Sequence, residues 1–342
     1  MPDPSAVDDA VAVFTDLREE GRELDALVEG LPAPDWARPT PAPGWTVAHQ
    51  IAHLHWTDRA SLLSLTDATG FGVMVEEALK APDSFVDDGA REGAALPPAE
   101  LLARWRGTRD ALAQALAAAS PDTRFPWYGP PMKAASMASA RLMETWAHGQ
   151  DVADALGVRR TPTARLRHVA RIGVRARDYA YAVRGLPAPD GEFRVELTAP
   201  DGVQVWAYGP PQAPQRITGP ALDFCLLVTQ RAHRADLELT ATGPDADRWL
   251  DIAQAFAGPA GAGREPGAGR EPGAAREPGA AREPGAGREP GAGREPGAAR
   301  EPGAAREPGA AREPGAAREP GAAREPEAGP DQEAGPVQGT GR

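Results

Sequence analysis

Three histidines fall close together in one mostly apolar stretch, Gly44 to Asp58, which reads GWTVAHQIAHLHWTD. They are His49, His53 and His55, half of the six histidines in the whole chain. A neutral imidazole is the commonest metal ligand in proteins and can also act as a general acid or base. This concentration predicts a functional site, provided that a second segment supplies further ligands.

A distant stretch, Arg141 to Leu156 (RLMETWAHGQDVADAL), supplies such residues. Glu144 and His148 are four positions apart, so on a helix both side chains project from one face. Apolar residues flank that face on both sides, which indicates a buried helix, and a buried carboxylate is costly unless it is paired or bound to a metal. With His53 as the third ligand, the set has the composition of a catalytic zinc site, which keeps one coordination position open.

Other residues near these three have less defined roles. His49 lies one turn before His53 and is interpreted as a fourth ligand, a hydrogen-bond partner of a ligand or a substrate contact. His55 points elsewhere and is expected at the surface. Asp151 is either a surface acid or a residue that holds His148 by a hydrogen bond. The alternative without a metal is a salt bridge from Glu144 to His148 or to an arginine.

Four long amphipathic helices are expected to position these residues. Helical spacing of apolar side chains marks each one, Pro32 and Pro34 end the first, and Gly157 suits the end of the fourth. Together they predict an antiparallel four-helix bundle in residues 1–160, with a short helix at 73–80, an acidic loop before Pro98 and a proline-rich loop at 120–131. The expected long helices are 5–29, 47–66, 98–119 and 134–156.

After the bundle the apolar period changes. A helix at 163–184 is followed by two alternating segments around Ala199-Pro200-Asp201-Gly202, a strong turn signal. Residues 161–258 therefore predict a linking helix and a small α+β domain. The expected strands are 192–197, 203–208, 215–218 and 236–240, and the expected helices are 220–230 and 245–256.

Residues 261–326 are eleven tandem copies of GAGREP or GAAREP. They contain no apolar side chain larger than alanine, and a proline at every sixth position is incompatible with a helix. We expect the folded part to end near Gly258 and residues 259–342 to form a disordered tail.

Composition restricts the other possibilities. The net charge is −12 with no basic patch, which argues against a nucleic-acid partner. No run of 18 apolar residues predicts a membrane span, and the single cysteine, Cys225, cannot form an internal disulfide. These features predict a cytoplasmic protein, a monomer or weak homo-oligomer, that acts on a small molecule.

The two histidine-bearing stretches resemble signatures of a known family. GWTVAHQIAHL resembles the W-[ST]-V-x-x-x-x-A-H-L signature of the mycothiol-dependent maleylpyruvate isomerase family, within the wider DinB-like metal-binding bundles. ETWAHGQDVADALG is similar to its E-x-x-x-H-x-x-D signature. The resemblance covers about residues 6–160 and implies metal ligands at His53, Glu144 and His148. More loosely, residues 190–257 resemble a sterol-carrier-like C-terminal domain, in which Arg231 is the nearest match to an arginine used toward the thiol or substrate.

These expectations lead to three functional hypotheses. The first is a thiol-dependent isomerase or S-transferase, with a divalent metal ion (zinc) and a low-molecular-weight thiol of the mycothiol type. The second is a hydrolase that uses metal-bound water. The third is a non-catalytic module that binds a small molecule in an apolar cavity of the C-terminal domain.

Overall fold

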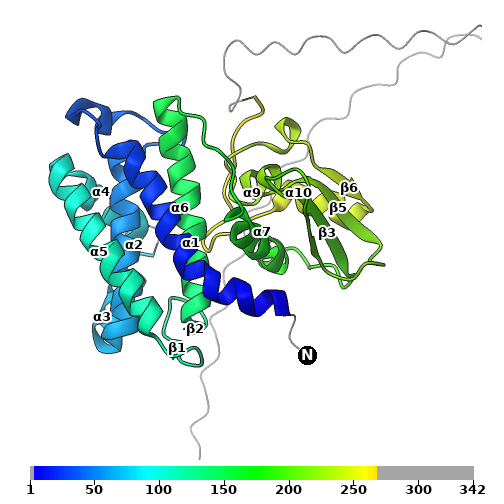
Figure 1. Cartoon of the computed structure of the whole chain (residues 1–342), viewed down its shortest axis with the longest axis horizontal. Helices are drawn as coiled ribbons and strands as arrows, with labels where there is room; N and C mark the ends of the chain where they lie inside the picture. The colour runs from blue at the N-terminus through cyan, green and yellow to red at the C-terminus, as the bar shows by residue number, and fades with distance from the viewer. Residues whose placement is uncertain (1–3, 83, 268–342) are drawn as a thin grey trace, which may run out of the picture. The chain divides into compact units, whose positions relative to one another are not determined.

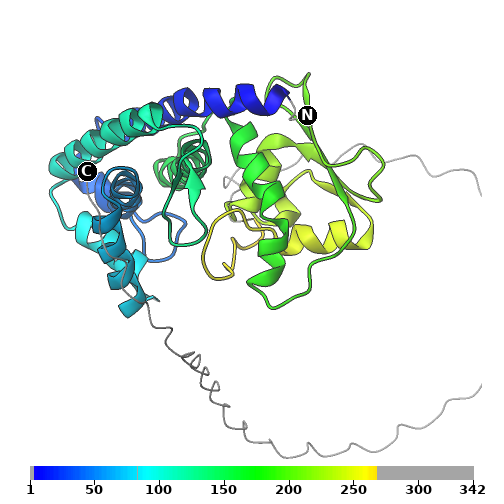
Figure 2. The same ribbon diagram turned by 90° about the horizontal axis from the view of Figure 1, so that it is seen from below.

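The computed structural model describes residues 4–82 and 84–267 (Figure 1). The four predicted long helices are present. They lie side by side in both views (Figure 1 and Figure 2), with α2 in contact with α5 and α6, and α1 in contact with α6. Their bounds are Pro4–Val28 for α1, Val47–Thr66 for α2, Pro98–Ala118 for α5 and Ala134–Leu156 for α6. Gly157 ends α6 in the left-handed conformation, with φ 67°.

The segment between α2 and α5 differs from the prediction. It holds α3, Ala68–Lys80, and a second helix, α4, Phe85–Ala94, where the sequence predicts a loop. The glycines that suggested a loop are contact points: a Cβ on Gly89 would come within 2.9 Å of Trp56, and one on Gly93 within 2.7 Å of Ala52. Glycine allows α4 to approach α2 this closely, so the loop prediction for residues 81–97 is wrong.

The connection from α5 to α6 is a small hairpin. Strand β1, Arg124–Phe125, pairs antiparallel with β2, Met132–Lys133. A short 3-10 helix, η1, Ala33–Ala37, follows α1 and buries Trp36. These two connections complete the helical part of the fold.

The C-terminal part contains the predicted mixture of helices and strands, with two changes. The expected helix at 163–184 is two helices that meet at Ala176, and the expected strand at 236–240 is a 3-10 helix followed by β6. The sheet order is β4-β3-β5-β6, and β3 and β5 are parallel whereas the other pairs are antiparallel. The elements are α7 Leu166–Arg175, α8 Arg177–Ala182, β3 Phe193–Thr198, β4 Val205–Tyr208, β5 Gln215–Pro220, α9 Ala221–Val228, η2 Arg234–Asp236, β6 Thr240–Thr242 and α10 Pro244–Ile252.

One apolar core cluster joins the bundle to the sheet. It includes Met137 and Trp146 of α6 together with Val195 of β3, Phe224 of α9 and Trp249 of α10. A second cluster, around Ile51 and Trp105, belongs to the bundle alone. The side chains of α6 therefore contribute both to the bundle and to the packing of the C-terminal part.

The described chain continues past the predicted end of the folded part. Residues 259–267 are placed against the domain, and Arg264 pairs with two acids of α6. The remainder of the predicted tail, 268–342, lies outside the described residues. Among the described helices, none combines the length and the apolar character needed to cross a bilayer.

Candidate metal centre

Helices α2 and α6 bring the three predicted ligands together. His53 Nε2 lies 3.4 Å and His148 Nε2 lies 3.2 Å from the same atom, Oε2 of Glu144. One potential ligand atom from each side chain falls within a set whose members are all within 4.8 Å of one another. His53 is 7% and His148 9% exposed, so both imidazoles approach this carboxylate in a largely buried space.

A chain of hydrogen bonds fixes which nitrogen of His148 carries the proton. The Thr40 hydroxyl donates to the carbonyl oxygen of Trp45, so the same hydroxyl oxygen accepts from the side-chain amide of Gln50. This orients the amide so that Gln50 Oε1 faces His148 Nδ1 at 2.5 Å. Because an amide oxygen only accepts, His148 donates through Nδ1–H, and its neutral ring presents a lone pair at Nε2.

The proton position makes the centre suited to a cation. His148 Nε2 and the ionised carboxylate of Glu144 are both acceptors, yet they lie 3.2 Å apart. His53 Nδ1 is buried and has no hydrogen-bond partner within the described residues, and its Nε2 faces the same carboxylate oxygen. A divalent ion between these atoms would convert a repulsive contact into coordination, and two histidines with one carboxylate form a recognised zinc ligand set.

The electrostatics keep Glu144 and His148 in their metal-binding forms at neutral pH. Burial raises the pKa of Glu144, but the side chains of His148 and His53 beside it outweigh that effect and hold the pKa well below its usual range. Burial, together with the charge of His53, lowers the pKa of His148 to about 4. Metal binding therefore requires no proton to be removed from Glu144 or His148 at neutral pH.

Trp45 covers one side of the centre. Its ring stacks on His148 with centroids 5.9 Å apart and lies 5.3 Å from the ring of His53. Its indole Nε1 donates a hydrogen bond to Asp87 of α4 at 3.0 Å. This bond holds the Trp45 ring against α4, the helix that the sequence did not predict. Trp45 and Gln50 are thus two functional candidates that sequence reasoning missed. The sequence feature that could have identified both residues is their position in the GWTVAHQ stretch, next to the histidines.

His49 does not join the three ligands. Its Nδ1 accepts from the backbone N–H of Thr46 and hydrogen-bonds the Thr46 hydroxyl at 2.8 Å. His49 therefore closes the first turn of α2, in the position that a glutamate or glutamine fills in a capping box. The structure gives His49 a helix-capping role, and its predicted part as a hydrogen-bond partner of a ligand or as a substrate contact stays a prediction.

Asp151 and Arg231, which the sequence analysis treated separately, form one buried pair. Arg231 Nη2 lies 2.8 Å from Asp151 Oδ2, and Asp151 is 2% exposed. Asp151 also pairs with Arg264, so Gln50 takes the place beside His148 that was assigned to Asp151. Arg231 therefore forms an ion pair with a carboxylate of the chain itself. Its positive charge also contributes to the lowered pKa of His148.

His55 is half-buried rather than at the surface, so this prediction is wrong. Its Nδ1 is enclosed without a hydrogen-bond partner in the described part of the chain. Burial, with the positive charges of Arg59 and Arg104, lowers the pKa of His55 from 6.5 to about 4.

The depressed pKa of His55 predicts an acid-sensitive contribution to stability. The unfolded chain takes up this proton as the pH falls below 6.5, whereas the folded chain does so only near 4, so stability is lost across that window. After allowance for partial exposure, we expect His55→Gln to reduce the loss between pH 7 and pH 5 by about 1 kcal/mol. Urea unfolding at the two pH values measures this difference. An unchanged pH dependence would contradict it.

The hydrogen bond from His148 to Gln50 predicts an effect on metal affinity. Gln50→Leu leaves Nδ1 without its acceptor and releases the ring orientation. Loss of such a supporting partner weakens binding roughly 10- to 100-fold. Competition for zinc against a chelator measures the change, with Gln114→Leu on the exposed side of α5 as the matched control. Equal affinities in the two variants would contradict the assigned tautomer.

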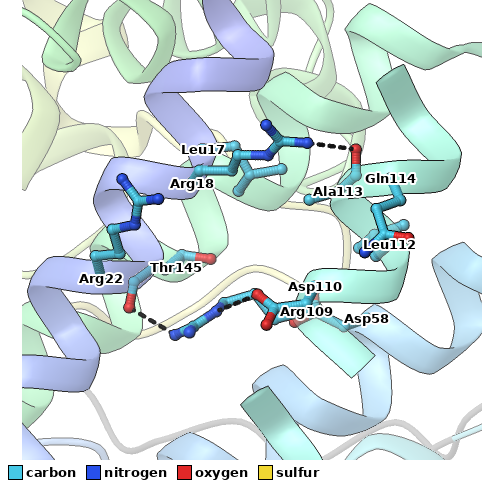
Figure 3. A pocket seen from close by; sticks show the side chains of 11 residues that line it. Leu17, Arg18, Arg22, Asp58, Arg109, Asp110, Leu112, Ala113, Gln114 and Thr145 are labelled. Carbon is cyan, nitrogen blue, oxygen red and sulfur yellow. Dashed lines mark hydrogen bonds and ion pairs between the residues drawn. The ribbon is translucent and has the colours of Figure 1, made fainter. Parts of the chain in front are cut away.

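Two cavities lie near the bundle, and neither is lined by His53, Glu144 or His148. The first, of about 220 Å³, lies between α1 and α5, with Asp58 and Thr145 in its lining (Figure 3). Figure 3 shows Arg18 and Arg109 on opposite walls, each engaged by hydrogen bonds or ion pairs of the chain. The second, of about 480 Å³, is lined by residues of α1, α6 and α9 and by Arg264. The apolar cavity that the third hypothesis places in the C-terminal domain stays a prediction.

Comparison with known proteins gives matches over both parts of the chain. The family model described as mycothiol maleylpyruvate isomerase N-terminal domain matches residues 17–153. A second, described as wyosine base formation, matches residues 189–242, which include the sheet. The likeness of that region to sterol-carrier proteins stays a prediction.

Curated relatives and solved structures were also found. Uncharacterized proteins from two strains of Mycobacterium tuberculosis are each 58% identical over 249 residues, which is 73% of this chain and 96% of theirs. Two crystal structures of the mycothiol-dependent maleylpyruvate isomerase, one of them a histidine-to-alanine mutant, are similar at 19% and 17% identity with a TM-score of 0.48 each. Each covers 69% of this chain and 95% of the other. At 58% identity over 96% of their length, the chain belongs to the same family as these mycobacterial proteins, and its helical part carries the mycothiol maleylpyruvate isomerase N-terminal domain over residues 17–153.

Proposed function

We propose that the chain is a zinc-dependent enzyme that uses a thiol of the mycothiol type, either to isomerise a small organic molecule or to become attached to it through the thiol sulfur. His53, Glu144 and His148 are the proposed ligands. The observation that carries the proposal is the 3.2 Å contact between two acceptors, His148 Nε2 and Glu144 Oε2, with the imidazole proton committed to Gln50.

The proposed chemistry follows from the ligand set. Three protein ligands leave a zinc ion one open position, where a bound thiol is stabilised as the reactive thiolate at neutral pH. Gln50, by accepting the Nδ1 proton of His148, would leave the Nε2 lone pair available to the ion. Trp45 limits access of water from one side, which favours a thiol or an apolar substrate over bulk solvent.

The protein itself supplies no competing thiol. Cys225 is fully buried in α9, and its Sγ lies 3.5 Å from the carbonyl oxygen of Leu166. Burial raises the pKa of this thiol far above its usual range, so it is neither ionised nor accessible. The nucleophile in this proposal is therefore an external thiol.

The experiment is an assay of isomerisation and S-transfer with the zinc-loaded chain, in the presence and absence of mycothiol, against a panel of small electrophiles with activated double bonds. We expect turnover only with both zinc and thiol, and loss of turnover in His53→Ala. A hydrolysis product formed with zinc alone would identify a hydrolase that uses bound water. Ligand binding that is unaffected by removal of zinc would identify a non-catalytic binding module. Either result would overturn the proposal.

A further inference from the structure

The first copy of the repeat occupies a defined place on the domain. Arg264, the fourth residue of GAGREP at 261–266, donates from Nη1 to Asp154 at 2.6 Å and from Nη2 to Asp151 at 2.8 Å. Its side chain is 11% exposed, which is unusual for an arginine in a sequence so rich in glycine and proline. The backbone N–H of Gly267 then donates to Asp236 at 2.6 Å.

The fit depends on glycine at three positions of this segment. A Cβ on Gly261 would come within 1.9 Å of Gln230 Oε1, which excludes any larger residue unless Gln230 moves. Gly263 and Gly267 have φ values of 70° and 79°, the left-handed region that other residues adopt at a cost. An alanine in place of Gly263 should lower the equilibrium constant for binding of this segment to the domain roughly 5- to 30-fold.

The repeats differ at the position of Gly263. Every copy begins with glycine, but the third residue is glycine in four copies and alanine in the other seven. The copies with glycine are 261–266, 267–272, 285–290 and 291–296, and each is followed by a glycine that corresponds to Gly267. Three later copies therefore carry the same determinants as the seated one.

We propose that the surface formed by Asp151, Asp154, Gln230 and Asp236 is a binding site for GAGREP, which the four copies with glycine at the third position occupy in exchange with one another. The seven GAAREP copies act as weak ligands and spacers. Four equivalent segments on one tether keep the site occupied when any one of them leaves, because each rebinds as an intramolecular event.

Occupancy of this site affects the surroundings of the metal centre. Asp151 lies three residues after His148 on α6 and is held by Arg231 on one oxygen and Arg264 on the other. Arg264 also forms part of the lining of the 480 Å³ cavity, together with Gln150 and Leu226. A repeat arginine thus completes the neutralisation of a buried acid and supplies a replaceable part of a cavity wall.

The 249 matched residues are 96% of the mycobacterial relatives, so the remainder of those chains is too short to contain the eleven repeats.

The test measures the binding of short synthetic peptides to full-length chains. Binding is monitored in NMR spectra through the shifts of the backbone amide signals of residues 150–158 and 228–236. The first chain carries Arg264→Ala, Arg270→Ala, Arg288→Ala and Arg294→Ala, which removes the arginine from every GAGREP copy and leaves only the weaker GAAREP copies to compete with an added peptide. We expect a blocked GAGREPG peptide to bind it 5- to 30-fold more tightly than GAAREPG, as roughly estimated from the cost of a left-handed alanine. GAGAEPG should not bind, and Asp154→Asn added to the same chain should abolish binding of GAGREPG.

Exchange between copies is tested by a second chain that carries Arg264→Ala alone. There the three remaining GAGREP copies compete, so the peptide should bind more weakly than to the fourfold variant. A matched chain with Arg264→Ala, Arg276→Ala, Arg282→Ala and Arg300→Ala, in which the three added changes fall on GAAREP copies, should behave like the single variant. Equal affinity of the peptide for the single and fourfold GAGREP variants would overturn the exchange, and equal binding of GAGREPG and GAAREPG would overturn the recognition.

Discussion

Glu144→Gln is expected to abolish metal binding while making the metal-free protein more stable. The carboxylate is the only anionic ligand in the set, so its loss should weaken zinc binding by more than the roughly 100-fold that a lost supporting hydrogen bond costs. In the wild-type chain His148 Nε2 lies 3.2 Å from Glu144 Oε2, and both atoms are acceptors. In the metal-free variant the glutamine can instead donate a hydrogen bond from its amide nitrogen to His148 Nε2. We expect a gain of about 1 kcal/mol from the hydrogen bond formed.

The opposite signs separate a metal site from a structural salt bridge. Zinc affinity is measured by chelator competition, and the free energy of unfolding by urea titration with a chelator present. Glu76→Gln, an exposed acid of α3, is the matched control and should change neither quantity. If Glu144→Gln retains its zinc, or destabilises the metal-free chain as loss of a salt bridge would, the proposed role of Glu144 is wrong.

Asp58→Ala is expected to be the most destabilising single change close to the centre. Asp58 accepts from Arg141 Nε at 3.0 Å, and the two residues are 5% and 3% exposed. Arg141 Nη2 is buried and already lacks a partner among the described residues, so removal of Asp58 leaves a buried cation almost unsupported. Breaking such a pair typically costs about 3–5 kcal/mol.

This loss is measured as the change in free energy of urea unfolding of the zinc-free chain. Asp122→Ala, in which the carboxylate is 92% exposed and paired with Lys133, is the matched control and should cost less than about 1 kcal/mol. The double change Asp58→Leu with Arg141→Met should recover much of the loss, because both charges leave the interior together. A cost below about 1 kcal/mol for Asp58→Ala would show that the pair does not hold α2 to α6.

The meeting of His53, Glu144 and His148 could be predicted because it depends on local patterns. Helical spacing placed Glu144 and His148 on one face, and the apolar neighbours of His53 indicated that it faces inward. Gln50 and Trp45 could not be assigned in this way. Their roles depend on Thr40 and on α4, which come from segments whose folded positions a single sequence does not reveal.

The errors elsewhere have similar physical origins. Gly89 and Gly93 were interpreted as loop residues, although they permit a close helix contact that depends on Trp56 and Ala52 of another element. The predicted end of the folded part at Gly258 was based on the composition of the repeats, which is nearly the same for every copy and does not distinguish the first one. The seating of Arg264 depends on two acids more than one hundred residues earlier in the chain, and composition carries no information on that contact.

Zinc K-edge X-ray absorption of the purified full-length chain, with and without mycothiol, tests the central claim most directly. The buried Cys225 is the only cysteine, so a sulfur ligand at the metal must come from the added thiol. We predict one zinc per chain with nitrogen and oxygen ligands alone, and a new sulfur at about 2.3 Å when mycothiol is added. A chain that binds no zinc, or whose zinc gains no sulfur ligand from mycothiol, would contradict the account.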